Sequence, residues 1–405
     1  MQLFQHQKEF LDKKPQRTAL VWSCGTGKTR AACEWAKLWG GTTLIVCPKA
    51  LKENWKRECQ KWGVGYYTVM TKEEFRRMAG QWEGVNNIII DECHNGFLTP
   101  HFKSQMSKAL KIFLKSYNPR ILLLSATVYT GSPWNVFQLA TLLGVKWNWV
   151  EFNYQFFDQV RMGGRIVPVP KRGIEPRLAA AVSKIASVVD INDCMDVPEQ
   201  LHTQPEYFKL TKEQEKAIKD AYDPVHIVRY TKQHEIENGV LIGDAQGLTQ
   251  DKFFETDKMD RIKALVDENK KVAIVCRYNL QIKAIWTELQ AGKKPVYIIN
   301  GAVKDRDKIT LAAEAADECV VLIQADCAEG YQLPSFGLCV FASQSYSYAK
   351  YEQVCGRFLR MDKPSRTTFV YLMTEGDSID QAVHNALRRK EDFQIALYQK
   401  GQLKF

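Results

Sequence analysis

The stretch TALVWSCGTGKTRAACEWAKLW, residues 18–39, decides the fold. It begins with a short uncharged apolar run, which predicts a buried strand, and it ends with apolar residues at helical spacing. Between the two parts, Gly25 and Gly27 precede Lys28 and Thr29. A strand that passes through a glycine-rich turn into a helix predicts the first unit of a parallel α/β sheet.

The same alternation continues outward from this stretch. Further apolar runs lie at residues 43–47, 87–90, 120–124, 271–275, 296–299, 320–323, 338–341 and 368–372. Each run is short and leads into polar or glycine-rich residues, as buried parallel strands do. We therefore predict an α/β fold of two tandem doubly wound parallel-sheet lobes. We place lobe 1 at residues 1–212, a linker at 213–255 and lobe 2 at 256–405.

The segment between the two sets of strands differs in composition. Residues 147–157 are dense in aromatic side chains, residues 163–176 have the Gly, Pro and basic content of a loop, and residues 177–190 have helical spacing. We predict a helical insertion here, with a protrusion at about residues 145–190. Aromatic residues of this kind usually pack in a core, but stacking on bases, or a wedge on duplex DNA that includes Trp147 and Trp149, stays open.

Composition narrows the class of protein. The chain has 405 residues, which suits two or three domains, and its net charge of +10 suits a polyanionic partner. The eleven cysteines include no C-x-x-C pair, which disfavours disulfides and structural zinc. The sequence has no apolar signal region and no run of about 20 apolar residues. We expect a cytoplasmic protein, in the host cytoplasm if the chain is viral, with no membrane partner.

Residues 23–29, SCGTGKT, have the composition of a phosphate-binding loop. Glycines let backbone amides wrap a phosphate chain, and the N-terminus of the following helix faces the anion. Lys28 would reach the β- and γ-phosphates of ATP, and Thr29 would ligate Mg²⁺. The strict pattern has glycine where this chain has Trp22. The predicted ATP-binding residues of the loop are Gly25, Thr26, Gly27, Lys28 and Thr29.

An acidic pair follows the apolar run at residues 87–90 directly. Asp91 would hold Mg²⁺ through water, and Glu92 would orient and deprotonate the attacking water. His94 would link the nucleotide site to neighbouring loops. The sequence therefore predicts ATP hydrolysis with ATP and Mg²⁺ as cofactors.

Several other segments carry recognisable motifs. They are residues 3–7 (LFQHQ), 44–55 (LIVCPKALKENW), 125–127 (SAT), 131–144, 300–306, 328–333 (AEGYQL) and 353–360 (QVCGRFLR). Together with the phosphate loop and DECH, they resemble the motifs of superfamily-two DExH helicases, and within these the Swi/Snf-type DNA-dependent ATPases. The resemblance covers nearly the whole chain and implies two RecA-like lobes with ATP bound between them.

The resemblance also implies roles for individual residues. Gln7 would read the adenine edge, and Gly330 would belong to the ATP site. Gln353, Arg357 and Arg360 would form the arginine-finger motif, with both arginines on one face of a helix and reaching the γ-phosphate. The residues implied to touch the nucleic-acid backbone are Pro48, Lys49, Thr127 and Gln332, the last of which stands where the family has Asn.

The expected function is a DNA-dependent ATPase that translocates on DNA or remodels it, with annealing or branch migration slightly favoured over processive unwinding. Its partner would be duplex, forked or branched DNA, and its compact build resembles monomeric bacterial or bacteriophage motors of DNA repair and recombination. Two alternatives stay open. DECH and SAT also permit an ATP-dependent RNA helicase. The other alternative is a non-catalytic ATP-regulated scaffold on nucleic acid with a decayed site, which the intact motif residues disfavour.

Overall fold

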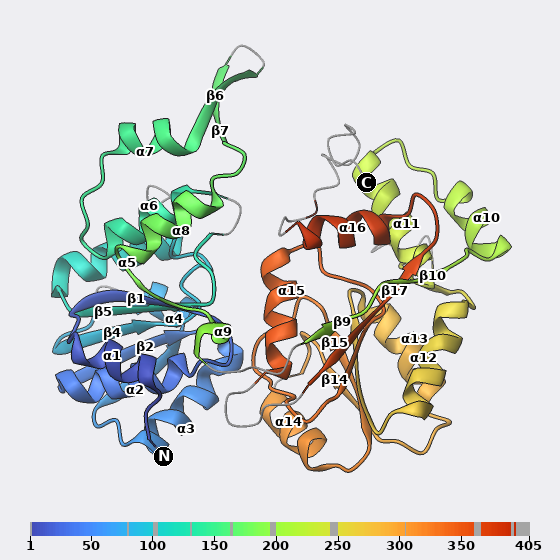
Figure 1. Ribbon diagram of the computed structural model, residues 1–405, viewed down its shortest axis with the longest axis horizontal. Coiled ribbons are helices and arrows are strands. Elements are labelled where there is room, and N and C mark those ends of the chain that lie inside the picture. Colours follow the sequence, from blue (N-terminus) through green and yellow to red (C-terminus); the bar gives the residue numbers. More distant parts are fainter. Residues whose placement is uncertain are drawn as a thin grey trace. The chain divides into compact units, whose positions relative to one another are not determined.

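The computed structural model describes residues 2–78, 81–99, 104–129, 132–162, 165–194, 200–243, 250–303, 305–359, 366–389 and 393. The chain divides into two compact units, Met1–Asp196 and Val197–Phe405, and each is an α/β sandwich (Figure 1). Within the ranges above, no helix is both long and apolar enough to cross a membrane.

The first unit is built on a six-stranded sheet with the order β3-β2-β4-β5-β1-β8, in which all neighbours are parallel. Its strands are β1 (Arg17–Trp22), β2 (Thr42–Cys47), β3 (Tyr67–Thr71), β4 (Val85–Ile90), β5 (Arg120–Ser125) and β8 (Ser187–Val189). The four predicted strands of this lobe are confirmed. Strands β3 and β8 were not predicted, because edge strands need only a short apolar run.

Helices cover both faces of this sheet (Figure 1). One face carries α1 (Gln5–Asp12), α2 (Lys28–Trp39) and α3 (Lys52–Trp62); the other carries α4 (Lys72–Met78), α5 (Gln105–Tyr117), α6 (Trp134–Leu142) and α8 (Glu175–Ser183). In β5, Ile121 and Leu123 face the core under α5, while Leu122 and Leu124 face the core under α2. Both sides of the strand are buried, which explains its continuous apolar run.

The insertion in this unit is helical only in part. Helix α7 (Trp149–Phe156) leads into an antiparallel hairpin of β6 (Phe157–Met162) and β7 (Arg165–Pro170), which projects from the rest of the unit (Figure 1). The loop predicted at residues 163–176 is therefore wrong over β7, because that segment pairs with β6 along its length. The helix predicted at residues 177–190 ends early, since α8 stops at Ser183 and β8 follows. A short helix, α9 (Ile191–Cys194), comes after β8.

The second unit is built on a seven-stranded sheet with the order β10-β17-β16-β13-β15-β14, and β9 pairs with β17 beside β10. Its strands are β9 (Leu201–His202), β10 (Glu206–Phe208), β13 (Lys271–Cys276), β14 (Val296–Ile299), β15 (Cys319–Gln324), β16 (Leu338–Phe341) and β17 (Thr368–Thr374). All the strand pairings in the described part of this sheet are parallel. The five strands predicted for lobe 2 are confirmed, and so is the two-lobed α/β fold.

Helices again lie on both faces of the second sheet. Helices α12 (Asp257–Glu268) and α13 (Asn279–Leu289) cover one face, and α14 (Arg306–Ala315) and α15 (Tyr348–Cys355) cover the other (Figure 1). At one end of the unit lie α10 (Lys212–Asp220), α11 (His226–Glu237), α16 (Ile379–Arg388) and the small hairpin of β11 (Val240–Leu241) and β12 (Lys252–Phe253).

The boundary between the units differs from the predicted one. Strands β9 and β10 lie within the predicted lobe 1, yet both pair with β17 of the second sheet. Leu201 N donates to Thr367 O at 3.2 Å, and Glu375 N donates to Phe208 O at 2.8 Å. The described residues of the predicted linker belong to the second unit as well, since α11 packs on α16. Such short edge strands leave no apolar run in the sequence.

Candidate nucleotide-binding site

Three loops of the first unit meet at one edge of its sheet. Strand β5 lies between β1 and β4, and all three are parallel. Their carboxyl ends therefore lie at the same edge, which is where parallel α/β sheets carry their ligand sites. These ends lead into the phosphate loop at residues 23–29, the DECH segment at 91–94 and the SAT segment at 125–127.

The phosphate loop has the backbone conformation that its glycines allow. Gly25 has φ of 84° and Gly27 has φ of 80°, both in the left-handed region. Gly27 is the N-cap of α2. Its φ of +80° favours glycine, and a Cβ atom at Gly27 would lie 2.5 Å from Gln7 Nε2, so the Gln7 side chain would have to shift to admit it.

Two side chains of helix α1 contact the backbone of the phosphate loop. The fully buried Gln7 accepts from Phe4 N through Oε1 at 3.0 Å and donates from Nε2 to Gly27 O at 3.1 Å. His6 Nε2 lies 2.9 Å from Thr26 O. The structure thus gives Gln7 a contact with the loop that the sequence analysis did not predict. Its contact with adenine stays a prediction.

Lys28 begins α2 and folds back over the loop. Its Nζ donates to Trp22 O at 2.7 Å and to Ser23 O at 3.2 Å. Thr26 Oγ1 donates to Ser23 O at 2.8 Å, which closes the turn. Thr29 is half-buried in the first turn of α2. A cation held by neutral carbonyls beside a helix N-terminus is placed to accept an anionic ligand.

Asp91 is the buried carboxylate of the site, with 7% of its surface exposed. Its Oδ2 accepts from Trp55 Nε1 at 2.8 Å, and its Oδ1 accepts from Glu92 N at 2.9 Å. Burial, and then the charge of Glu92, raise the pKa of Asp91 to about 6, although the Trp55 hydrogen bond and Lys28 act in the opposite direction. Trp55 was not predicted as a site residue, although it ends the motif segment at residues 44–55.

Glu92 and His94 connect the acidic pair to β5. Glu92 has a left-handed backbone with φ of 49°, which is uncommon for a residue with a side chain. His94 Nδ1 lies 3.3 Å from Glu92 Oε2 and 2.9 Å from Ser125 Oγ, and Ser125 Oγ also contacts Thr127 O. His94 therefore contacts both Glu92 and the end of β5, and its link from a nucleotide site to this loop stays a prediction.

In the second unit, Arg357 organises the loop at residues 328–333. Its Nε donates to Ala328 O at 2.6 Å, and its carbonyl accepts from Leu333 N at 2.8 Å. When the Gln332 amide is oriented by its partners, Nε2 donates to Arg357 O at 3.0 Å and Oε1 accepts from the guanidinium at 3.2 Å. Gly330 lies in this loop with φ of 82°. The Gln332 side chain is thus hydrogen-bonded to both the backbone and the guanidinium of Arg357.

The helix predicted to carry both arginines does not extend that far. Helix α15 ends at Cys355, a 3₁₀ turn covers Gly356–Phe358, and Leu359 is extended. The predicted helix through Arg357 is therefore wrong, and the Arg357 carbonyl accepts from Leu333 N instead. Arg360 lies outside the described residues, and its role stays a prediction.

Gln353 is the most unusual of the predicted residues in the second unit. It is 2% exposed, and neither its Oε1 nor its Nε2 has a hydrogen-bond partner within the described part of the chain. Buried polar atoms are nearly always hydrogen-bonded, so an unsatisfied amide is the kind of group that a ligand or a moving loop completes.

The predicted nucleic-acid residues of the first unit lie at the same sheet edge as the phosphate loop. Pro48 and the exposed Lys49 follow β2 directly. Thr127 follows β5, and its Oγ1 donates to Tyr129 O at 3.2 Å. The structure thus brings these residues to one edge but gives no evidence of what they bind.

The second unit also contains a depression that was not predicted from the sequence as a binding site. Its volume is about 480 Å³, and it lies at the carboxyl ends of β13 and β15, with Arg277, Asn279, Lys283 and Gln324 in its lining. The signal in the sequence was the polar RYN segment directly after the apolar run at residues 271–275.

Comparison with known proteins supports the fold. No protein-family model and no curated protein sequence matches the chain. Among solved structures, the chain is similar to the Hef helicase domain of Pyrococcus furiosus, with 14% identity over 94% of this chain and 97% of that chain and a TM-score of 0.53. Two RecA-like lobes are the fold of this chain.

A second solved structure is the Sulfolobus solfataricus SWI2/SNF2 ATPase core in complex with dsDNA. It shares 17% identity over 100% of this chain and 94% of that chain, with a TM-score of 0.39.

Proposed function

We propose that the chain is a nucleic-acid-dependent ATPase that couples ATP hydrolysis to translocation on DNA or remodelling of DNA. One observation carries this proposal. The first sheet brings a lysine at a glycine-rich helix N-terminus and a buried acidic pair to the same edge, from Lys28 and from Asp91–Glu92. This combination is the one that phosphoryl transfer from a nucleoside triphosphate requires.

The residues present fit Mg²⁺ and ATP. Mg²⁺ takes oxygen ligands, and Thr29 and Asp91 offer a hydroxyl and a carboxylate. Asp91 is buried, and the hydrogen bonds that it accepts within the described structure come from the neutral groups Trp55 Nε1 and Glu92 N. A bound cation would supply a positive charge beside it, and it would also neutralise charge on the phosphates.

The residues of the first unit have separate tasks in the proposed reaction. Lys28 exchanges the carbonyls of Trp22 and Ser23 for the β- and γ-phosphates, and the amides at the start of α2 hold the same anion. Glu92 orients a water molecule and takes its proton during attack. His94 keeps Glu92 connected to the β5 loop, so a change at the phosphates reaches the candidate nucleic-acid residue Thr127.

The second unit contributes positioning in this proposal. Arg357 keeps the loop at residues 328–333 in shape, including Gly330 and the candidate backbone contact Gln332. Gln353 offers an unsatisfied amide for the catalytic state. Arg360 is proposed as the cation that reaches the γ-phosphate, where arginine fingers contribute about 10³–10⁵ in rate in related reactions.

Nucleic acid is the proposed activator because the chain carries a net charge of +10 and exposes Lys49 at the sheet edge. Contacts to the backbone through Pro48, Lys49, Thr127 and Gln332 would give little sequence preference. They would also give binding that weakens steeply with salt.

The deciding experiment measures ATP turnover with duplex, single-stranded, forked and four-way DNA, and with RNA. We expect DNA to stimulate turnover, with branched DNA at least equal to duplex. Glu92→Gln should retain binding of ATP and DNA while turnover falls about a hundredfold or more. Preferential stimulation by RNA would make the chain an RNA-dependent motor, and turnover that ignores every polynucleotide would refute the proposal.

A further inference from the structure

The aromatic stretch at residues 147–157 separates into a packed cluster and one exposed ring. Trp149 and Phe157 stack on Trp134 at 5.7 and 4.5 Å between ring centroids, and Trp147 stacks on Phe152 at 5.6 Å. These rings pack against one another, which confirms the packing interpretation for this cluster. Tyr154 is different, because 80% of it is exposed.

The exposed tyrosine stands at the base of the β6–β7 hairpin. Lys171 follows β7, donates from N to Phe156 O at 3.0 Å and from Nζ to Tyr154 O at 2.7 Å, and lies 5.3 Å from the Tyr154 ring. Phe157 starts β6 within the aromatic cluster and is 3% exposed. A two-stranded hairpin is marginal by itself, so these contacts fix where it begins.

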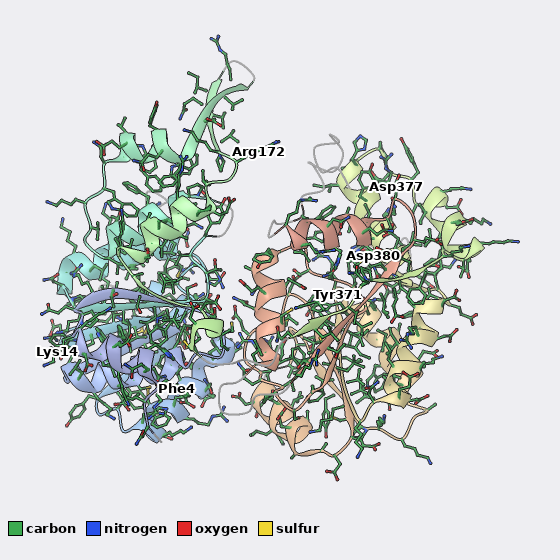
Figure 2. The ribbon with its side chains drawn as sticks, in the orientation of Figure 1. Phe4, Lys14, Arg172, Tyr371, Asp377 and Asp380 are labelled. Carbon is green, nitrogen blue, oxygen red and sulfur yellow. The ribbon has the colours of Figure 1, made fainter. Side chains whose placement is uncertain are left out.

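The hairpin presents cations and apolar side chains to solvent. Ile166 is 69% exposed, Val160 and Val167 are also exposed, and Arg161 and Arg172 are exposed beside them. Arg172 follows the hairpin at its base (Figure 2). Residues 157–172, the hairpin and the two residues after it, contain four basic residues and one acidic residue, Asp158. This charge is complementary to a phosphate backbone.

The hairpin is poorly suited to the commonest way of binding a protein segment through a strand. Pro168 and Pro170 lie in β7 and carry no N–H, so this strand offers few donors to an added strand. Exposed tyrosine beside lysine and arginine is instead the combination by which proteins bind unpaired nucleotides. Apolar side chains such as isoleucine also separate stacked base pairs in known complexes.

We propose that Tyr154 and the β6–β7 hairpin form an arm that binds DNA at the junction between paired and unpaired strands. Tyr154 stacks on an unpaired base, while Arg161, Lys171 and Arg172 contact the adjoining phosphates. A junction is required because a base within a duplex has no free face for the ring. The inference rests on the proposed function and specifies which DNA structure the motor engages.

The first test places 2-aminopurine at the first unpaired position of forked DNA and measures its fluorescence with the full chain. We expect quenching by the wild type and by Tyr154→Phe. Tyr154→Ala should lose the quenching and bind the fork at least about fivefold more weakly, with binding to blunt duplex unchanged. Tyr66→Ala is the matched control, since Tyr66 is also 80% exposed in the same unit.

The second test measures the salt dependence of fork binding for Arg161→Gln combined with Arg172→Gln. Each lost phosphate contact should reduce the slope by about one, while Arg77→Gln in α4 should leave it unchanged. Fork binding that is the same in wild type, Tyr154→Ala and the double variant would overturn the arm, and a protein partner would then be the remaining occupant.

Duplex-stimulated ATP turnover, measured on the same preparations, separates the two proposals. If turnover responds to DNA but the arm variants do not affect fork binding, only the arm is wrong. If the arm variants weaken fork binding while turnover ignores every polynucleotide, the motor is wrong and the arm stands.

Discussion

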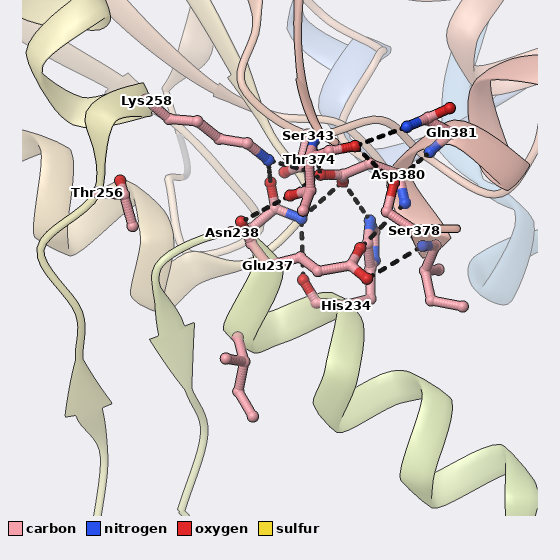
Figure 3. A network of polar contacts seen from close by, with 12 residues as sticks. His234, Glu237, Asn238, Thr256, Lys258, Ser343, Thr374, Ser378, Asp380 and Gln381 are labelled. Carbon is pink, nitrogen blue, oxygen red and sulfur yellow. Dashed lines mark hydrogen bonds and ion pairs between the residues drawn. The ribbon is translucent and has the colours of Figure 1, made fainter. Parts of the chain in front are cut away.

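The two units each contain a pair of buried carboxylates, and the two pairs have opposite surroundings. In the second unit, Asp380 bonds to His234 Nε2 at 3.0 Å, Asn238 Nδ2 at 2.8 Å and Lys258 Nζ at 2.5 Å (Figure 3). In the first unit, Asp91 accepts from the indole of Trp55 and from a backbone N–H, which are both neutral donors.

The pKa values move in opposite directions accordingly. Burial by itself would raise the pKa of Asp380, but Lys258 and His234 hold it well below its usual range. Burial and Glu92 raise the pKa of Asp91 to about 6. Removing the partner of a compensated buried carboxylate is strongly destabilising, whereas a carboxylate that lacks such a partner is suited to a ligand.

The neighbouring glutamates differ in what they contact, although burial and then the charge of Asp380 raise the pKa of Glu237 to about 8. Glu237 accepts from the backbone N–H groups of Ile379 and Asp380, each at 3.1 Å, at the start of α16. It thereby joins α11 to α16, while Lys258 joins α12 to the same cluster (Figure 3). Glu92 instead stands in a loop with a left-handed backbone and a histidine neighbour. We infer that the cluster of the second unit is structural and that of the first is chemical.

The largest expected effect comes from a substitution that breaks the cluster around Asp380 in the second unit. Lys258→Met should destabilise the second unit by about 3–5 kcal/mol, because it leaves the Asp380 carboxylate buried without its cation. Urea unfolding of the full chain, followed by hydrogen exchange of α16, measures this loss. A variant as stable as the wild type would mean that the cluster does not hold the unit together.

The second effect removes the corresponding lysine of the first unit. Lys28→Ala should lower ATP turnover by about 10²–10³-fold, because one preorganised charge on the phosphates is lost. Its unfolding free energy should change by less than that of Lys258→Met, since the Lys28 ammonium donates to the backbone carbonyls of Trp22 and Ser23, which are neutral. Steady-state turnover and urea unfolding of both variants test the contrast.

The third effect concerns the shape of the phosphate loop. Gly27→Ala should destabilise the chain by about 1–3 kcal/mol and weaken ATP binding, because φ is +80° and the new Cβ meets Gln7 Nε2. Gly63→Ala is the matched control, with φ of +67° and no atom within 4 Å of its Cβ. If the two variants lose equal stability and Gly27→Ala binds ATP normally, the close approach to Gln7 is unimportant.

The smallest expected effect is an increase in the stability of the second unit. Gln353→Leu should stabilise the second unit by up to about 1 kcal/mol, because it removes a buried amide without partners in the described structure. ATP turnover should fall in the same variant. Gln138→Leu in α6 removes another buried amide whose Nε2 has no such partner, and it should leave turnover unchanged. Normal turnover in Gln353→Leu would assign Gln353 to packing alone.

Much of the first site could be predicted because its parts are local. The run at residues 18–22, the glycines and the helix after Lys28 follow one another without interruption, so periodicity and backbone freedom indicate them directly. Asp91 was predicted because a parallel sheet places the ends of its strands at one edge. Helix continuation past Cys355 was wrong, since a 3₁₀ turn and an extended Leu359 follow, and the Arg357 carbonyl accepts from Leu333, which is distant in sequence.

The sequence alone determined the two α/β sheets, the glycine-rich turn and the acidic pair, because each depends on residues next to one another in the chain. Only the tertiary structure brought Trp55 to Asp91, Gln7 to Gly27 and Glu237 to the start of α16. It also paired β9 and β10 with β17 and turned one tyrosine of an aromatic stretch toward solvent. These outcomes depend on strand order and on packing between distant segments. Neither of these produces a periodic pattern of apolar residues that could be recognised in the sequence.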